Sequence, residues 1–324
     1  MAVRNLLILL LFACFPSFAR AAEELLIFSE AGSGMQIEKQ FATESETKLF
    51  TTISTELQTP VSRLAVDGSV YSFTNLDSLA NWQIGAIYER TLPLLNFSIS
   101  GRYLDDENDS LDVTQATVQL FRQRESLTDF SEYGLWGRNS SFPQNDAFSN
   151  LEFNAYFITK KFLETYTVHH EFNAATKHFA DLTPLLAVNY QITFFFPAGN
   201  YSRLNLTYFF NYNIHKENKL LYPSEELFDL FSYNMHKFSI EYSVEKSNLL
   251  YKPWFALNSK DYLATAVEQP YSEINFLAGF YADWLWADGC MTYAEGFYQT
   301  IFSDNEIAFE FVAGLKFQFD ILTR

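Results

Sequence analysis

Cysteine is nearly absent from this chain of 324 residues, which contains only Cys14 and Cys290. A chain of this length with so few cysteines is not one of the disulfide-stapled extracellular scaffolds. Glycine (12 residues) and proline (9 residues) are also sparse. Charged residues make up only 19% of the chain against 48% hydrophobic residues, which excludes a disordered or low-complexity protein. Only 22 bases stand against 39 acids, giving a formal net charge of -17. A general nucleic-acid binder needs a net basic face, so no nucleic-acid partner is expected.

Long apolar runs are missing after residue 21, so no transmembrane helix is expected. The N-terminus has Arg4 followed by the apolar run Leu6–Phe15, which is too short to span a bilayer, and then the small residues Ala19 and Ala21. This pattern predicts a secretory signal peptide over residues 1–21, and a single mature domain over residues 22–324. An alternative is a lipoprotein signal in which Cys14 is lipidated.

Aromatic residues are abundant: 34 Phe, 19 Tyr and 5 Trp make up 18% of the chain, yet the mean hydropathy is only -0.08. Large apolar side chains must therefore be interleaved with polar ones. In residues 201–214 the even positions from Leu204 to Ile214 are apolar, whereas most odd positions, such as Arg203 and Asn205, are polar. A period of two indicates a β-strand with two chemically opposite faces.

Similar alternation recurs along the whole mature chain. It predicts strands near 47–58, 62–73, 81–89, 94–103, 112–123, 130–138, 150–161, 165–178, 184–196, 201–214, 235–246, 249–259, 271–284, 289–302 and 306–321. A further strand near 34–43 would make sixteen, an even number that places both termini on one side of a barrel. Tight connections alternate with longer polar ones, which is typical of an up-and-down antiparallel β-barrel of about 14–16 strands.

The two-faced strands are compatible with two environments. In a soluble sandwich or lipocalin-like barrel the apolar face would point inward. However, about fifteen such strands with a charged polar face would overfill any soluble core. We therefore expect the apolar face to meet lipid and the polar face to line a wet lumen, inside a wall that is closed because lipid cannot satisfy a free strand edge. A soluble secreted β-protein is the alternative.

The signal, the alternating strands and the amphipathic last strand Glu306–Ile321 together resemble a Gram-negative outer-membrane β-barrel protein of porin-like size. The resemblance covers the whole mature chain but identifies no porin subfamily. It implies location in the outer membrane after export, short periplasmic turns and longer extracellular loops. It also implies contact with lipid, lipopolysaccharide and the barrel assembly machinery, with self-association as a further option. Such proteins usually end on an aromatic residue, whereas this chain ends Leu322-Thr323-Arg324.

The inferred lumen face carries charges of both signs. The candidate lumen-lining residues are Arg102, Glu152, His169, Glu171, Arg203, Lys237, Glu241, Glu245, Glu310 and Lys316. Further charged residues on the same inferred face are Lys48, Glu56, Glu89, Asp112, Arg122, Lys160, Asp283 and Asp320, which makes ten acids and seven bases in all. This mild acidic excess predicts a weak preference for cations in a channel for small hydrophilic solutes. For any one residue, cross-strand ion pairing that merely fills the lumen is the alternative.

Signals for catalysis are weak. His169 and Glu171 share a strand face, so an acid–base pair or metal ligation is geometrically feasible there, but no second ligand group supports it. The mature chain has no nucleophile elbow, phosphate loop or His-Glu-x-x-His motif, so no cofactor is expected. A barrel enzyme or an adhesin-like surface protein is the alternative function.

Two of the predicted loops have features of their own. The segment 224–231 in the longest loop predicts a helical turn that constricts the mouth or packs on the rim. The acidic run 105–109 is either a solvated loop or a cation site.

Overall fold

The computed structural model describes residues 26–39, 46–73, 80–92, 94–105, 112–142, 149–179, 184–214, 232–262, 271–287, 289–301 and 306–322. The signal segment, the acidic run from residue 106 onward and the helical turn 224–231 lie outside these residues. So do the side chains of a few strand-end residues, including Asp320. No helix among the described residues is both long enough and apolar enough to span a membrane.

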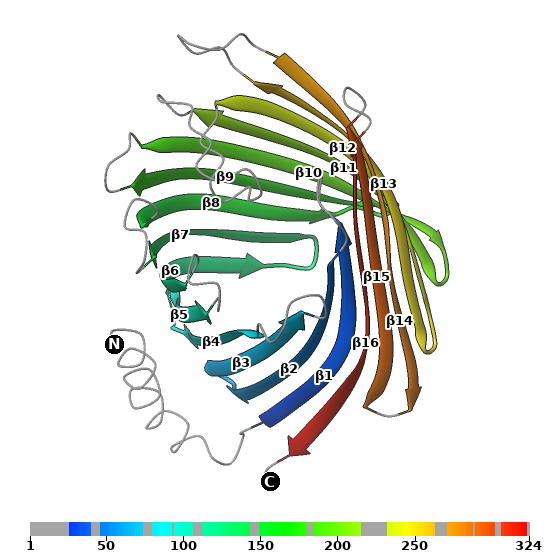
Figure 1. Ribbon diagram of the computed structural model, residues 1–324. Helices are drawn as coiled ribbons and strands as arrows, with labels where there is room; N and C mark the ends of the chain where they lie inside the picture. The colour runs from blue at the N-terminus through cyan, green and yellow to red at the C-terminus, as the bar shows by residue number, and fades with distance from the viewer. Residues whose placement is uncertain are drawn as a thin grey trace.

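Sixteen strands form one closed barrel in which every strand pairs antiparallel with its neighbours in sequence, and β1 pairs with β16 to complete the ring (Figure 1). The fold is thus the all-β up-and-down barrel predicted from the sequence. The strands are β1 Leu26–Lys39, β2 Glu46–Thr59, β3 Ser62–Phe73, β4 Ala80–Thr91, β5 Asn96–Asp105, β6 Val113–Glu125, β7 Asp129–Ser141, β8 Asn150–Phe162, β9 Thr167–Phe179, β10 Leu185–Gly199, β11 Ser202–Ile214, β12 Tyr233–Lys246, β13 Leu249–Tyr262, β14 Tyr271–Ala287, β15 Cys290–Ile301 and β16 Glu306–Leu322.

The first strand is the largest departure from the predicted boundaries. We expected a strand near 34–43, but β1 runs over Leu26–Lys39 and pairs along its whole length with β16. Its centre, Ser29–Gly34, consists mostly of small residues and shows no contrast between apolar and polar positions. Pairing with two neighbours, rather than its own hydrophobic pattern, holds this strand in place.

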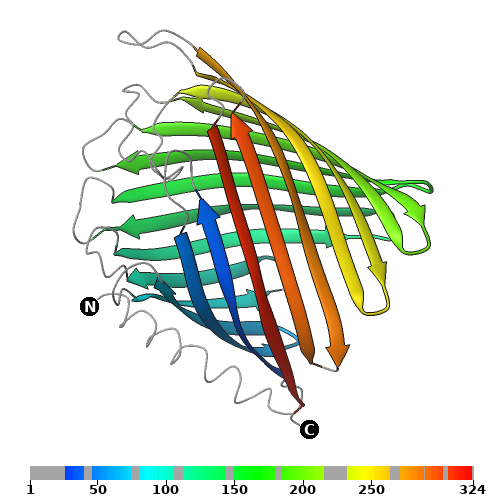
Figure 2. The same cartoon turned by 45° about the vertical axis from the view of Figure 1, so that its right-hand side comes forward.

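The two ends of the barrel differ in their connections. Leu26 pairs with Leu322 and with Gln58, so both ends of the described chain lie beside the tight turn between β2 and β3 (Figure 2). Two-residue turns also join β10 to β11 and β12 to β13 at this end. The longer connections, such as the one between β11 and β12, leave from the opposite end. This sidedness is the one expected of an outer-membrane barrel.

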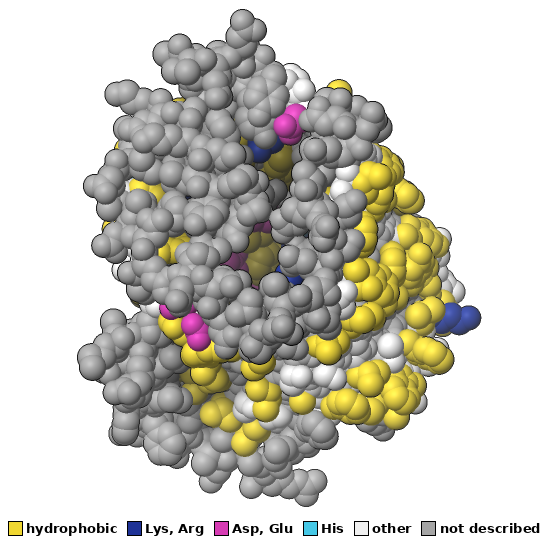
Figure 3. Space-filling view, viewed as in Figure 1, with side chains coloured by type: hydrophobic (Ala, Val, Ile, Leu, Met, Phe, Trp, Pro, Cys, Tyr) yellow, Lys and Arg dark blue, Asp and Glu magenta, His cyan; other side chains and the backbone are white. Residues whose placement is uncertain are grey.

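The outer face of the barrel is apolar. Figure 3 shows hydrophobic side chains gathered over the flank formed by the last strands. Large side chains that stay exposed include Leu49, Ile53, Val70, Leu120, Leu135, Phe153, Phe172, Leu206, Phe238, Ile240, Phe255, Leu257, Ile274 and Trp284. A soluble protein would bury these groups in a core, whereas a closed barrel in lipid turns them outward.

Candidate functional site

The face opposite the exposed apolar side chains lines the lumen, and β12 shows the alternation clearly. Phe238, Ile240 and Tyr242 are exposed on the outer face. Lys237, Ser239 and Glu241, at the alternate positions, line an interior cavity. The strand period of two therefore assigns each residue of the barrel wall to one face.

All ten candidate lumen-lining residues lie on the inward register of their strands. Their side chains meet other inward groups in interior cavities, hydrogen bonds or ion pairs; these residues are Arg102, Glu152, His169, Glu171, Arg203, Lys237, Glu241, Glu245, Glu310 and Lys316. Their role in permeation stays a prediction.

Three of the other charged residues do not extend this set. Arg122 pairs with Tyr133 and shares its strand face with the exposed Leu120, so it lies on the outer face and the expectation that it lines the lumen was wrong. It lies near the short-turn end of β6. At the end of a strand the outer face lies beyond the central apolar band, so a basic side chain costs little there. Asp112 precedes β6 and belongs to no strand face. The side chain of Asp320 is outside the described part of the chain.

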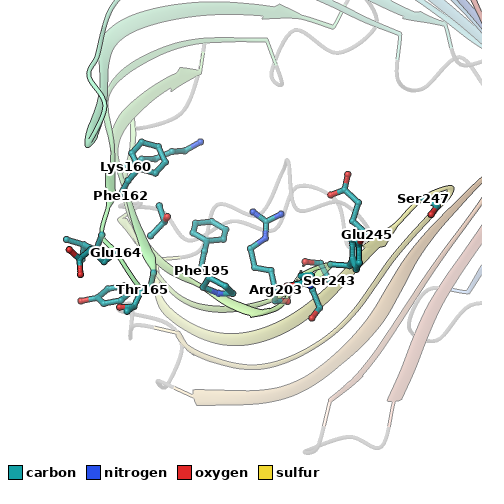
Figure 4. Close-up of a pocket in the computed structure, with 16 residues that line it drawn as sticks. Lys160, Phe162, Glu164, Thr165, Phe195, Arg203, Ser243, Glu245 and Ser247 are labelled. Carbon is teal, nitrogen blue, oxygen red and sulfur yellow. Dashed lines mark hydrogen bonds between the residues drawn. The ribbon is translucent and has the colours of Figure 1, made fainter.

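A cavity with a volume of about 820 Å³ lies at the short-turn mouth. Lys160, Arg203 and Glu245 point into it from three strands (Figure 4). The guanidinium carbon of Arg203 lies 5.8 Å from the ring centre of Phe195, a cation–π contact that holds the base against the wall. Glu245 thus lies at the mouth away from the longest loop.

Several inward charges are paired across strands, and three of these residues were not predicted from the sequence. Arg63 bonds Glu56 at 2.8 Å and Glu89 at 3.1 Å, with its side chain 41% exposed. Both acids were predicted to face the lumen, but the base between them was not, although Arg63 falls in the polar register of the predicted strand 62–73.

The other two missed residues are Glu30 and Arg138. Glu30 lies 3.3 Å from Lys316. Glu30 belongs to β1, whose start was predicted too far along the chain. Arg138 lies 3.7 Å from Glu152. Alternation within the predicted strand 130–138 would have indicated Arg138, whereas no sequence signal pointed to Glu30.

The histidines of β9 are divided between the two faces. His169 and Glu171 share the inward face, as predicted, but Glu171 accepts a hydrogen bond from Asn173 Nδ2 at 2.9 Å rather than pairing with His169. His170 faces outward, where its Nδ1 lies 3.0 Å from the hydroxyl of Tyr190. Within the described ranges, no three His, Cys, Asp or Glu side chains come together as metal ligands would.

Glycines let large inward rings lie along the wall. A Cβ atom on Gly134 would stand 2.8 Å from the ring of Tyr156, and one on Gly279 would stand 2.6 Å from the indole of Trp254. Each ring therefore occupies the space that a side chain on the neighbouring strand would fill. The consequence is that the rings cover the backbone rather than project across the lumen.

Comparisons with known proteins find likeness only at the level of the fold. No family model matches the chain, and no curated protein matches it. Among solved structures, a bacterial polysaccharide outer membrane secretin is similar at a TM-score of 0.59 and 10% identity, over 91% of this chain and 98% of that one. The outer membrane protein opdK from Pseudomonas aeruginosa gives 0.59 at 9% identity, over 92% and 99%. OccAB4 of Acinetobacter baumannii gives 0.52 at 9% identity, over 92% and 98%. The chain therefore has the fold of outer-membrane β-barrel proteins.

Proposed function

We propose that the chain is an outer-membrane channel for passive or weakly selective diffusion of small hydrophilic solutes. The observation that carries this proposal is a closed wall that is apolar outside and charged inside, with interior cavities lined by ionisable side chains. Buried charges are costly unless they are paired or hydrated, so such a lining favours a water-filled lumen. We further propose that residues 1–21 direct export and that the barrel resides in the outer membrane of a Gram-negative bacterium.

Unpaired carboxylates support a weak preference for cations. Glu241 accepts a hydrogen bond from Asn205 Nδ2 at 2.7 Å. In the part of the chain that the structure describes, neither Glu241 nor Glu245 forms a salt bridge. Their negative charges are available to a passing cation, while the nearby Arg203 and Lys160 keep the preference small.

Planar-bilayer recording of refolded protein tests both parts of this proposal. We expect discrete conductance steps, and a reversal potential under a salt gradient that indicates a slight excess of cation flux. Glu241→Lys combined with Glu245→Lys should move the reversal potential toward anions, because each change replaces a negative charge by a positive one. Asp261→Lys is the matched control, since Asp261 shares the outward register of the exposed Leu257 near the other end of β13.

The absence of conductance steps from a folded barrel would contradict the channel. An unchanged reversal potential in the double variant would contradict the role of Glu241 and Glu245 in cation preference, because it would remove both carboxylates from the ion pathway.

Residence in a membrane is tested separately. The protein should require detergent for extraction, and it should migrate differently on gels before and after boiling because a closed hydrogen-bonded barrel resists unfolding. Recovery as a freely soluble periplasmic protein would contradict the proposal.

A further inference from the structure

A second interior cavity, of about 360 Å³, lies in the wall formed by β9 to β13. Its volume falls within the roughly 300–1,000 Å³ typical of small-molecule sites. Five strands contribute side chains of complementary chemistry: an indole, a carboxylate, an ammonium group, amides, hydroxyls and an imidazole. The lining includes His169, Thr193, Asn205, Lys237, Glu241 and Trp254.

Trp254 provides a flat apolar platform in this cavity. Its indole lies over Gly279, where an added Cβ would be only 2.6 Å away, and it stacks on Phe297 with ring centroids 6.0 Å apart. The ammonium nitrogen of Lys237 lies 5.7 Å from the indole centre. The indole is therefore fixed against the wall, with a cation over its ring.

A carboxylate with spare acceptor capacity lies beside the platform. Asn205, which is 9% exposed, donates from its Nδ2 to Glu241. Among the described residues this is the one side-chain hydrogen bond that the Glu241 carboxylate accepts. Thr193, which is 4% exposed, is already satisfied by a 3.0 Å contact between its hydroxyl and that of Thr207. Because a carboxylate has about four lone-pair sites, Glu241 can accept further hydrogen bonds, which favours a ligand rich in hydroxyl donors.

The charges in the cavity suit a neutral ligand. Lys237 and Glu241 are the base and the acid among its lining residues, so together they leave the site without net charge.

We propose that this cavity is a binding subsite for a neutral saccharide. The apolar face of a sugar ring packs on Trp254, and its hydroxyls donate to Glu241, whose carboxylate Asn205 holds in place. The inference rests on the proposed function, since a solute reaches this wall only through an open lumen.

Calorimetry on the full-length barrel tests binding without requiring conduction. The protein is kept in a detergent that has no sugar headgroup and titrated with maltose and with glucose. We expect saturable binding, and at least a tenfold rise in Kd for Trp254→Ala. Asn205→Ala should also weaken binding, and it leaves the packing of the indole on Gly279 intact in case Trp254→Ala fails to fold.

Trp136→Ala is the matched control. Trp136 is an inward tryptophan of β7 that lies outside this cavity, with the guanidinium carbon of Arg138 4.7 Å from its ring centre. This variant should bind sugar as the unmodified protein does. Equal losses of affinity in the Trp136 and Trp254 variants would overturn the proposal.

Other outcomes separate the subsite from the channel. If neither sugar binds to a barrel whose migration still changes on boiling, the subsite is wrong whether or not the protein conducts. If glycine binds and the sugars do not, the site accepts zwitterions and the proposal is overturned. If maltose binds with the expected dependence on Trp254 but no conductance is seen, the subsite stands and the channel proposal fails.

Discussion

The assignment of faces is tested most directly by placing an arginine on each side of one strand. Ile240 is the eighth of the fourteen residues of β12 and is 53% exposed. Its cross-strand partners Leu206 and Phe255 are also exposed and apolar, so an arginine here finds no counterion on its own face. A base at the midplane of an outer-membrane barrel costs about 2–4 kcal/mol. Ile240→Arg should therefore lower the folding equilibrium constant by roughly 30-fold to 1,000-fold.

Ser239 is the internal control, since it is the next residue and lines the interior cavity. The arginine of Ser239→Arg should project into water. This variant should therefore change the free energy of unfolding much less than Ile240→Arg does. Urea titration of both variants in lipid vesicles, followed by gel migration without boiling, measures the difference. If Ser239→Arg is the more destabilising of the two, the apolar face points inward and the soluble β-protein should replace the membrane barrel.

Two further substitutions probe the lumen wall. Gly134→Val should destabilise the barrel by about 1–3 kcal/mol, because its Cβ would stand 2.6 Å from a backbone oxygen, whereas Gly137→Ala, with no contact under 3.6 Å, should be tolerated in the same urea titration. Arg63→Ala should lower stability by at most about 1 kcal/mol, since exposed ion pairs contribute little, but it should move the reversal potential toward cations because Glu56 and Glu89 lose their counterion. An unchanged reversal potential in Arg63→Ala would show that the charges at the short-turn mouth do not control ion selectivity.

The number of strands and the identity of their faces were predictable because the side-chain period of a strand is two. A slip of one residue would exchange the faces, so segments with strong contrast such as 201–214 determine their own register. Prediction failed where the contrast between apolar and polar positions along a strand was weak. The small residues of β1 gave no pattern, so its start was misplaced, and Arg122 was assigned inward although the exposed Leu120 on the same face indicates the opposite.

The site itself was only partly predictable. Alternation identified His169, Lys237 and Glu241 as inward residues. However, no local pattern tells which inward residues on different strands lie at the same height along the barrel axis. Height depends on the stagger between neighbouring strands, which the barrel sets as a whole. The hydrogen bond between Asn205 and Glu241 joins residues 36 positions apart, so the cavity was not visible in the sequence.

Glycine connects the two proposals. A wide lumen and an aromatic binding surface are opposing requirements, because a ring that projects inward narrows the passage. At Gly279 the absence of a side chain lets the indole of Trp254 lie on the neighbouring strand, so the same contact clears the lumen and fixes a platform. A larger residue at position 279 would have to push the indole away from the wall. It should therefore reduce conductance and sugar affinity together, whereas Trp254→Ala should reduce affinity without narrowing the passage.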